Sequence, residues 1–151
     1  MRTALFTLLL LALPTSATCW SQAGKRYGIE PILLQAIAIT ESSMNPSAVN
    51  KNNDGSYDIG LMQINSRHLP ALNKYRITQR RLLEDPCLSV MTGAWILASF
   101  IRRHGYNWEA VGAYNAGSTP QRGYLRQRYV YRVLPNYLLL QQKQAPNRAI
   151  Q

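Results

Sequence analysis

The sequence predicts a single, mainly α-helical domain that carries one small β region. Prolines and glycines recur along the chain at spacings that begin and end helices. Turn-forming residues instead gather in one stretch, residues 50–65, between helical segments. A chain of 151 residues with 46% hydrophobic content suffices for one domain with a core. No internal repeat, low-complexity tract or linker in the sequence indicates a second domain.

The first 17 residues have the pattern of a secretory signal peptide. Arg2 is followed by a mostly apolar stretch, residues 4–13, and then by Pro14 and the small residues 15–17. This stretch is too short to span a bilayer as a helix, for which about 20 residues are needed. We therefore expect a signal peptide over residues 1–17, a folded domain over residues 18–151 and export to the periplasm. Lipid attachment at Cys19 is the alternative, and the preceding Ser-Ala-Thr sequence disfavours it.

The helices are expected in the following order. A first helix covers residues 19–27 and ends before Gly28, and Pro31 begins a second one over residues 31–42. The second helix is apolar almost all round, which is typical of a helix buried in the middle of a domain. Further helices are expected over residues 78–83, 86–104, 107–115 and 123–142. Pro135 is expected to break or kink the last of them.

Between the second and third helices, residues 45–58 are expected to form a loop. Turn formers dominate this segment, and short strands are expected only within residues 58–64. A reversal of direction alone does not explain the polar side chains spaced through this region, Asp58 in particular.

The two cysteines, Cys19 and Cys87, remain in the exported chain. In an oxidising compartment we expect them to form a disulfide, and two unrelated buried thiols are the alternative. The two histidines, His68 and His104, stand alone, and no Cys/His cluster has zinc-site spacing. The sequence therefore predicts no metal and no cofactor.

The chain is strongly basic, with 17 Lys and Arg against 7 Asp and Glu and a net charge of +10. Such a balance favours an acidic partner, which includes nucleic acid, an anionic membrane surface and an anionic cell-wall polymer. Export argues against nucleic acid. A surface whose charge only keeps the protein soluble is the alternative.

Among the seven carboxylates, Glu41 is the best candidate for chemistry. Most of the others have simple structural roles in turns, helix caps or first helical turns. Glu41 ends the most apolar helix, where burial and the negative helix C-terminus both raise the pKa of a carboxyl group. A carboxylic acid that stays protonated near neutral pH is what general-acid catalysis requires. A solvent-exposed glutamate at a frayed helix end is the alternative.

Four motifs resemble those of a known enzyme family. AIAITESSMNPSAVN (residues 36–50), GLMQIN (60–65), AVGAYNAG (110–117) and RYVYRV (128–133) resemble the successive motifs of lytic transglycosylases with a lysozyme-like domain. They fall in the family's order and span nearly all of the mature chain. The closest resemblance is to the small exported enzymes that accompany type III secretion, type IV pilus and conjugation machines. The Cys-Trp start at residues 19–20 and Asp-Pro-Cys at 85–87 also match that subgroup, which supports the disulfide.

The resemblance implies an α+β lysozyme-like fold, with a helical domain and a small β-hairpin region beside an active-site cleft. It implies cleavage of the β-1,4 bond between N-acetylmuramic acid and N-acetylglucosamine in peptidoglycan glycan strands, with formation of 1,6-anhydromuramoyl ends. Glu41 would act as acid and then as base. This local opening of the wall would serve a secretion, pilus or conjugation apparatus. The protein is expected to act as a monomer.

The same resemblance predicts a set of substrate-binding residues: Ser42, Gly60, Met62, Gln63, Tyr114, Asn115 and Tyr129. Met62 and Gln63 are expected to line the sugar cleft, and Asn115 to lie beside Glu41. Tyr129 is expected to donate a hydrogen bond that orients Glu41, while Tyr114 shapes the cleft wall. For Tyr114 and Met62, core packing is the alternative.

The stretch NNDGSYDIGLMQINSRH also resembles the β-hairpin region of animal-type lysozymes, where an Asp at the position of Asp58 is the second catalytic carboxylate. Many lytic transglycosylases lack this acid, so the sequence departs from them here. Asp58 is predicted to stabilise positive charge in the transition state, and a structural role in the hairpin is the alternative. A hydrolytic muramidase that uses Glu41 and Asp58 is a competing function, and a non-catalytic wall-binding component is another.

Overall fold

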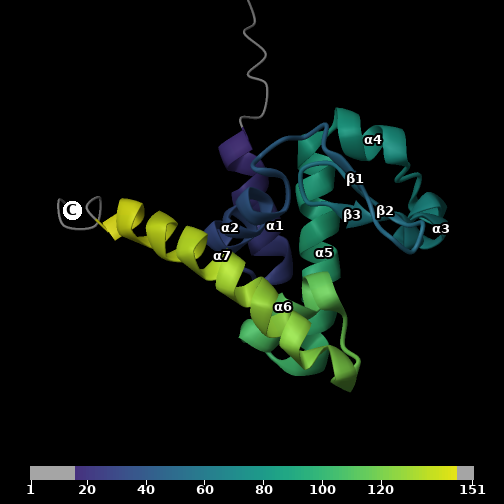
Figure 1. The fold of residues 1–151 in the computed structure, drawn as a ribbon. Coiled ribbons are helices and arrows are strands. Elements are labelled where there is room, and N and C mark those ends of the chain that lie inside the picture. The colour runs from purple at the N-terminus through teal and green to yellow at the C-terminus, as the bar shows by residue number, and fades with distance from the viewer. Residues whose placement is uncertain (1–15, 146–151) are drawn as a thin grey trace, which may run out of the picture.

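The computed structural model describes residues 16–145. Within this range the chain forms seven α-helices, three short 3-10 turns and one small sheet. Figure 1 shows the sheet, α3 and α4 on one side of the long helix α5, with α1, α2 and α7 on its other side. The expected signal peptide lies outside the described residues except for its last two positions.

The helices are α1 Ser16–Tyr27, α2 Pro31–Ser42, α3 Leu69–Leu72, α4 Gln79–Glu84, α5 Pro86–His104, α6 Trp108–Ala116 and α7 Gly123–Gln144. Local signals explain most of these bounds. The side chains of Thr78, Asp85 and Asn107 accept hydrogen bonds from the backbone N–H groups that open α4, α5 and α6. The predicted helices are confirmed at these positions. The short helix α3 was not predicted.

Helix α2 lies in the middle of the helical part, as its apolar sequence predicts. Its residues Leu34, Ala36, Ile37 and Ala38 have no exposed surface. Helix α7 packs along α2 and α6, while α5 packs against α1 and α6. The C-terminal end of α2, and therefore Glu41, is held between elements that come from distant parts of the sequence.

Pro135 does not break the last helix, because α7 runs without interruption through it. Proline removes one backbone N–H and crowds the preceding turn. The turn before it has side-chain partners: the carbonyl of Arg132 lies 3.4 Å from both Thr40 Oγ1 of α2 and Asn136 Nδ2. Of the two effects expected of Pro135, the break is therefore wrong, while a kink within the continuous helix stays a prediction.

The sheet consists of β1 Val49–Lys51, β2 Tyr57–Ile59 and β3 Ile64–Asn65, antiparallel and in the order β1-β2-β3. Strand β1 lies in the segment expected to be a loop, so that prediction is wrong. All three β1 residues are exposed, and no alternation of apolar side chains marks them in the sequence. Pairing with β2 forms the strand, with Val49 opposite Ile59 and Lys51 opposite Tyr57.

Two glycines let the sheet region pack closely on the helices. Gly60 has a φ of +72°, and a Cβ there would lie 2.8 Å from the carbonyl oxygen of Leu82. At Gly93 of α5, a Cβ would lie 2.8–3.0 Å from atoms of the Met62 side chain. Met62 therefore enters the core against α5, where its side chain has no exposed surface.

The predicted disulfide between Cys19 and Cys87 is confirmed, with the two Cα atoms 5.3 Å apart. It joins α1 to the first turn of α5 across a sequence separation of 68 residues. None of the described helices is long and apolar enough to cross a membrane.

Candidate active site

A cleft of about 640 Å³ lies between the sheet region and the helices. Glu41 from α2 and Asp58 from β2 both line it. Gln63 lies on the sheet side of the cleft, while Tyr114 and Asn115 come from α6. The structure thus brings together five of the nine residues predicted to be catalytic or substrate-binding.

Glu41 lies in the last turn of α2 and is half-buried. Burial raises its pKa from 4.5 to about 7, and the negative charge of Asp58 acts in the same direction. The hydrogen bond from Tyr129 and the positive charge of Arg132 oppose this shift. The predicted rise in the pKa of Glu41 is confirmed, and the group is poised to donate and accept a proton near neutral pH.

Tyr129 of α7 holds the Glu41 carboxyl group. Its hydroxyl donates to Glu41 Oε1 at 2.6 Å, and only 2% of the side chain is exposed. Burial, followed by the charge of Glu41, raises the pKa of Tyr129 well above 10, so the hydroxyl keeps its proton and remains a donor. This geometry matches the orienting role that the resemblance implies for Tyr129.

The residue before Glu41 is also tied to α7. Asn136 donates to Thr40 Oγ1 at 3.0 Å, and Arg132 donates to the Thr40 backbone carbonyl at 3.3 Å. The Arg132 guanidinium also lies 5.9 Å from the centre of the Tyr129 ring. One face of α7 therefore fixes both the backbone and the side chain at the end of α2.

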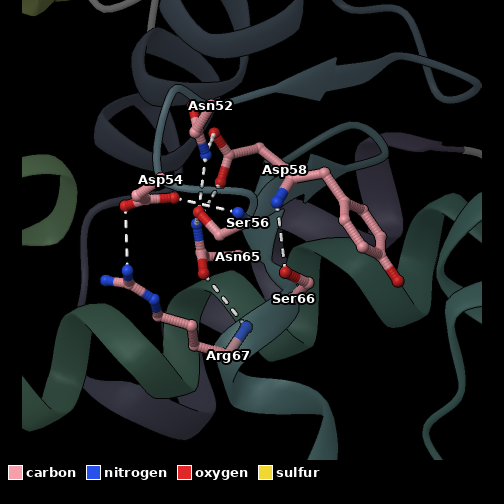
Figure 2. Close-up of polar contacts among 8 residues, drawn as sticks. Asn52, Asp54, Ser56, Asp58, Asn65, Ser66 and Arg67 are labelled. Carbon is pink, nitrogen blue, oxygen red and sulfur yellow. Dashed lines mark hydrogen bonds and ion pairs between the residues drawn. The ribbon is translucent and has the colours of Figure 1, made fainter.

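Asp58 is held by two side-chain amides. Asn65 Nδ2 donates to Asp58 Oδ1 at 2.8 Å, and Asn52 Nδ2 donates to Asp58 Oδ2 at 3.0 Å (Figure 2). Both donors are side chains of the sheet region, Asn65 from β3 and Asn52 from the turn after β1. Because each carboxylate oxygen accepts one amide hydrogen, the group is fixed in orientation as a hydrogen-bond acceptor.

A second set of polar contacts braces the turn between β1 and β2. Asp54 accepts from the Ser56 backbone N–H at 2.9 Å and pairs with Arg67 at 2.8 Å (Figure 2). Hydrogen bonds from Ser56 lower the pKa of Asp54. Ser56 Oγ in turn accepts from Asn52 and Asn65, the two residues that hold Asp58. The turn thus fixes the partners of Asp58.

The cleft floor beneath the two carboxylates is also hydrogen-bonded. Tyr114 donates its hydroxyl hydrogen to the Met62 carbonyl at 2.7 Å, and burial raises its pKa well above 10. Gln63, which has a φ of +51°, accepts from Asn50 Nδ2 at 2.8 Å and donates to the Gly60 carbonyl at 2.9 Å. These bonds connect α6 and the sheet across the bottom of the cleft.

Residues 18–132 match the family model for the transglycosylase SLT domain. The chain belongs to the transglycosylase SLT domain family. As an SLT-domain protein it is a peptidoglycan lytic transglycosylase. Its disulfide and its action on peptidoglycan together indicate a location outside the cytoplasm.

Several curated proteins resemble this SLT domain along most of their length. Invasion protein IagB of Salmonella typhimurium (strain LT2) is 52% identical over 129 residues, which cover 85% of this chain and 81% of that protein. Protein IpgF of Shigella flexneri is 47% identical over 122 residues, covering 81% of this chain and 80% of that protein. A peptidoglycan-binding-like protein of Escherichia coli O157:H7 is 37% identical over 146 residues, which cover 90% of this chain and 87% of that protein.

Among solved structures, the SLT domain is similar to an inactive mutant of the lytic transglycosylase Slt from Pseudomonas aeruginosa, with a TM-score of 0.68 and 22% identity. The match covers 87% of this chain and 24% of that one, so the chain spans about a quarter of the length of Slt. The likeness confirms the predicted fold, a lysozyme-like helical domain with a small sheet beside the cleft.

Four residues predicted to bind substrate do not line the cleft of the SLT domain: Tyr129, which instead holds Glu41, and Ser42, Gly60 and Met62. Met62 is fully buried against α5, so the prediction that its side chain lines the cleft is wrong. Gly60 is buried at a left-handed turn beneath Leu82. Ser42 donates to the carbonyl of Leu61 at 2.7 Å and so joins the end of α2 to the sheet region. These three residues support the cleft through contacts in the core and do not face the substrate.

Sequence reasoning missed other residues of the SLT-domain site. Arg122 and His68 line the cleft; no motif marks Arg122, and His68 ends the stretch that resembles the lysozyme hairpin but was given no role there. Arg126 is buried, pairs with Glu109 and donates to the carbonyls of Gly117 and Thr119, so it holds the loop that carries Arg122. In the described part of the chain, no three His, Cys, Asp or Glu side chains come together in a group that could hold a metal ion.

Proposed function

We propose that this enzyme cleaves the β-1,4 bond between N-acetylmuramic acid and N-acetylglucosamine and leaves a 1,6-anhydromuramoyl end. The observation that carries the proposal is a single carboxyl group, Glu41, with a pKa of about 7 in a cleft of about 640 Å³. A group with this pKa is protonated in a large fraction of molecules at neutral pH and is also readily regenerated as a base.

In the first step, Glu41 donates its proton to the glycosidic oxygen. The bond between this oxygen and C1 of the muramoyl residue breaks, and positive charge develops on C1 and the ring oxygen. Glu41 is left as a carboxylate, which the hydroxyl of Tyr129 stabilises through its hydrogen bond at 2.6 Å. Tyr129 is a positioning residue, because it acts through Glu41.

In the second step, the C6 hydroxyl of the same muramoyl residue attacks C1. Its proton passes to the carboxylate of Glu41, which returns to the acid form, and the new bond closes the 1,6-anhydro ring. No water is consumed. The same group serves as acid and then as base, which is consistent because the first step leaves it ready for the second.

We assign Asp58 the role of stabilising the positive charge that develops at C1. Its carboxylate lines the same cleft as Glu41, and its two amide donors hold it in place. By analogy with lysozyme, the two carboxylates lie in different environments, with Glu41 as the proton donor and Asp58 held as a hydrogen-bond acceptor. Asp58 also favours a second candidate function, hydrolysis, in which water attacks the stabilised C1.

Product analysis separates the two reactions. Transglycosylation gives anhydromuramoyl ends, whose mass is lower by one water than the reducing ends that hydrolysis gives. Mass spectrometry of fragments released from purified peptidoglycan measures this difference directly. Reducing ends as the main product would refute the transglycosylase reaction and support the muramidase.

The role of Glu41 is tested by Glu41→Gln, which keeps the shape and hydrogen bonding of the side chain but cannot exchange the proton. We expect loss of at least about a thousandfold in the rate of peptidoglycan clearing, the order of effect expected for removal of a general acid. Glu84→Gln is the matched control, because Glu84 is an exposed acid of α4 outside the cleft. A folded Glu41→Gln protein with clearing within tenfold of wild type would remove Glu41 from the mechanism.

We further propose that the enzyme is exported by a signal peptide over residues 1–17 and acts in the periplasm. The resemblance to small exported transglycosylases supports a role in opening the wall for a type III secretion, type IV pilus or conjugation machine. Cell fractionation of the full-length protein tests the location. Recovery in the cytoplasm with residues 1–17 still attached would refute it.

A further inference from the structure

A second cavity, which we call the aromatic pocket, lies at the opposite end of α2 from Glu41. It has a volume of about 140 Å³. The rings of Tyr106, Trp108 and Tyr137 and the carboxylate of Glu30 line it, together with aliphatic side chains from α2, α5 and α6. Tyr106 and Trp108 are 51% and 37% exposed, so the pocket opens to solvent.

The aromatic pocket is separate from the catalytic cleft. The two cavities share no lining residue. Glu30 precedes the first turn of α2 and Glu41 lies in its last turn, which places them roughly 16 Å apart at about 1.5 Å per residue. A group bound in the aromatic pocket therefore does not occupy the position where glycan is cleaved.

The polar groups of the pocket are already held in place. Tyr137 donates its hydroxyl hydrogen to Glu30 Oε2 at 2.5 Å, and Gln141 donates to the Tyr137 oxygen at 2.9 Å. Tyr106 accepts from the Glu30 backbone N–H at 3.0 Å. The Trp108 ring packs edge to face on Tyr137, with ring centres 5.5 Å apart. The hydrogen bond to Glu30 raises the pKa of Tyr137 to about 12, so this phenol remains a donor.

The carboxylate of Glu30 accepts a hydrogen bond from Tyr137 but, within residues 16–145, has no positively charged side chain as a partner. Glu30 stands at the N-cap of α2, yet its side chain makes no capping hydrogen bond. Among the described residues, no Lys, Arg or His nitrogen lies within 4.0 Å of it, although the whole chain has a net charge of +10. Glu30 is thus a negative group beside the exposed rings of Tyr106 and Trp108. A carboxylate and aromatic faces both attract cations, so the pocket is suited to bind one.

We propose that the aromatic pocket binds a primary ammonium group on an aliphatic stem, as carried by the diamino-acid residue of a peptidoglycan peptide stem. The ammonium would bond to Glu30 and lie against the rings of Tyr106 and Trp108, because aromatic faces attract cations. The aliphatic stem would cover the apolar floor of the pocket. A neutral sugar would gain neither the charge-assisted bond nor the cation–π contact.

The choice of a peptide stem rests on the proposed function, since peptidoglycan is the polymer on which the enzyme acts. Free ammonium groups occur on stems that are not cross-linked. A stem of the strand being cleaved, or of a neighbouring strand, would then hold the enzyme on the wall while the cleft works on glycan. The pocket would thus add a contact to the peptide part of a substrate whose glycan part occupies the cleft.

The test uses a sugar-free stem peptide that ends in the diamino acid, and the same peptide with its side-chain amine acetylated. Each is added to isotope-labelled wild-type protein, and the indole N–H signal of Trp108 is followed by NMR. We expect a saturable shift with the free amine and at least a tenfold weaker response with the acetylated peptide. Glu30→Gln should weaken binding of the free amine at least tenfold. Trp95→Phe, which removes a tryptophan of similar exposure outside the pocket, should leave that binding unchanged.

Equal responses to the two peptides, or a response that survives Glu30→Gln, would overturn the proposal. A Trp108 signal that moves with a lysine-rich protein segment but not with the stem peptide would refute the stem as ligand. The comparison of the free and the acetylated peptide uses wild-type protein, so it does not depend on how a variant folds. Because the peptide carries no glycan, a negative result leaves the Glu41 test of the proposed function unaffected, and the two failures are distinguishable.

Discussion

Replacing Tyr129 by phenylalanine tests how the hydroxyl of α7 sets the acidity of Glu41. The change removes the donor that lies 2.6 Å from Glu41 Oε1 and keeps the buried ring. A hydrogen bond to a charged acceptor contributes about 1.5–3 kcal/mol. At ~1.36 kcal/mol per pKa unit, the lower end of this range corresponds to roughly one unit. The half-buried position of Glu41 favours that lower end.

The direction of the shift follows from the state that the bond stabilises. The Tyr129 hydroxyl lowers the pKa of Glu41, and the wild-type value is about 7. Its loss raises that pKa, so the general acid stays protonated to higher pH. We expect the alkaline limb of the pH–rate profile to move upward by about one pH unit. The maximum rate should fall roughly tenfold, because the carboxyl group loses its fixed orientation.

The assay is the rate of release of soluble fragments from purified peptidoglycan between pH 5 and pH 9. Tyr131→Phe is the matched control, since Tyr131 lies on the same helix, is 65% exposed and makes no contact with Glu41. Its profile should coincide with that of the wild type. An unchanged alkaline limb in Tyr129→Phe, with the protein folded, would show that Tyr129 does not tune Glu41.

Three further predictions concern the carboxylates and the disulfide. Asp58→Asn should slow peptidoglycan cleavage about tenfold, which corresponds to ~1.4 kcal/mol of activation barrier, and should change the melting temperature little. If Asp58 has only a structural role, the variant should instead have a lower melting temperature and full activity per folded molecule. Reduction of the bond between Cys19 and Cys87, or its replacement by two serines, should lower the free energy of unfolding by about 4 kcal/mol in denaturant titrations, and an unchanged midpoint would contradict this. Folding raises the pKa of Glu41 from 4.5 to about 7, so the wild type loses stability as pH rises through this window. Glu41→Gln does not titrate, and its stability relative to wild type should increase by about 1–3 kcal/mol between pH 4 and pH 8; a difference independent of pH would show that Glu41 is not perturbed by folding.

The helices were predictable because their ends carry local signals. Pro31, Asp85 with its following proline, and Asn107 act within a few residues of themselves, and the structure keeps the boundaries that they mark. Strand β1 was not predictable, because its three exposed residues become a strand only through pairing with β2. Pro135 was expected to break or kink α7, and the helix continues through it without a break.

In the active site, the sequence predicts those properties that are set by the helix or strand that carries the residue. The apolar sequence of α2 was enough to predict that burial raises the pKa of Glu41. It could not predict Arg132 and Asn136, because their contact with Thr40 depends on how α7 crosses α2. Met62 was predicted to line the cleft but is fully buried, because a motif gives the order of residues and not the direction in which each side chain points.

The bond between Tyr129 and Glu41 joins residues that are 88 positions apart in the chain. Both carboxylates lie inside the loop that the disulfide closes, whereas α7, which covers Glu41, follows all the other described helices in the sequence. Before α7 docks, the end of α2 is less buried, and we expect the pKa of Glu41 to lie nearer to 4.5. We therefore expect activity on the cell wall only after α7 has docked on α2. A truncated product that lacked α7 would carry both acidic residues, and we expect it to be inactive on peptidoglycan because Glu41 would lose its partner Tyr129.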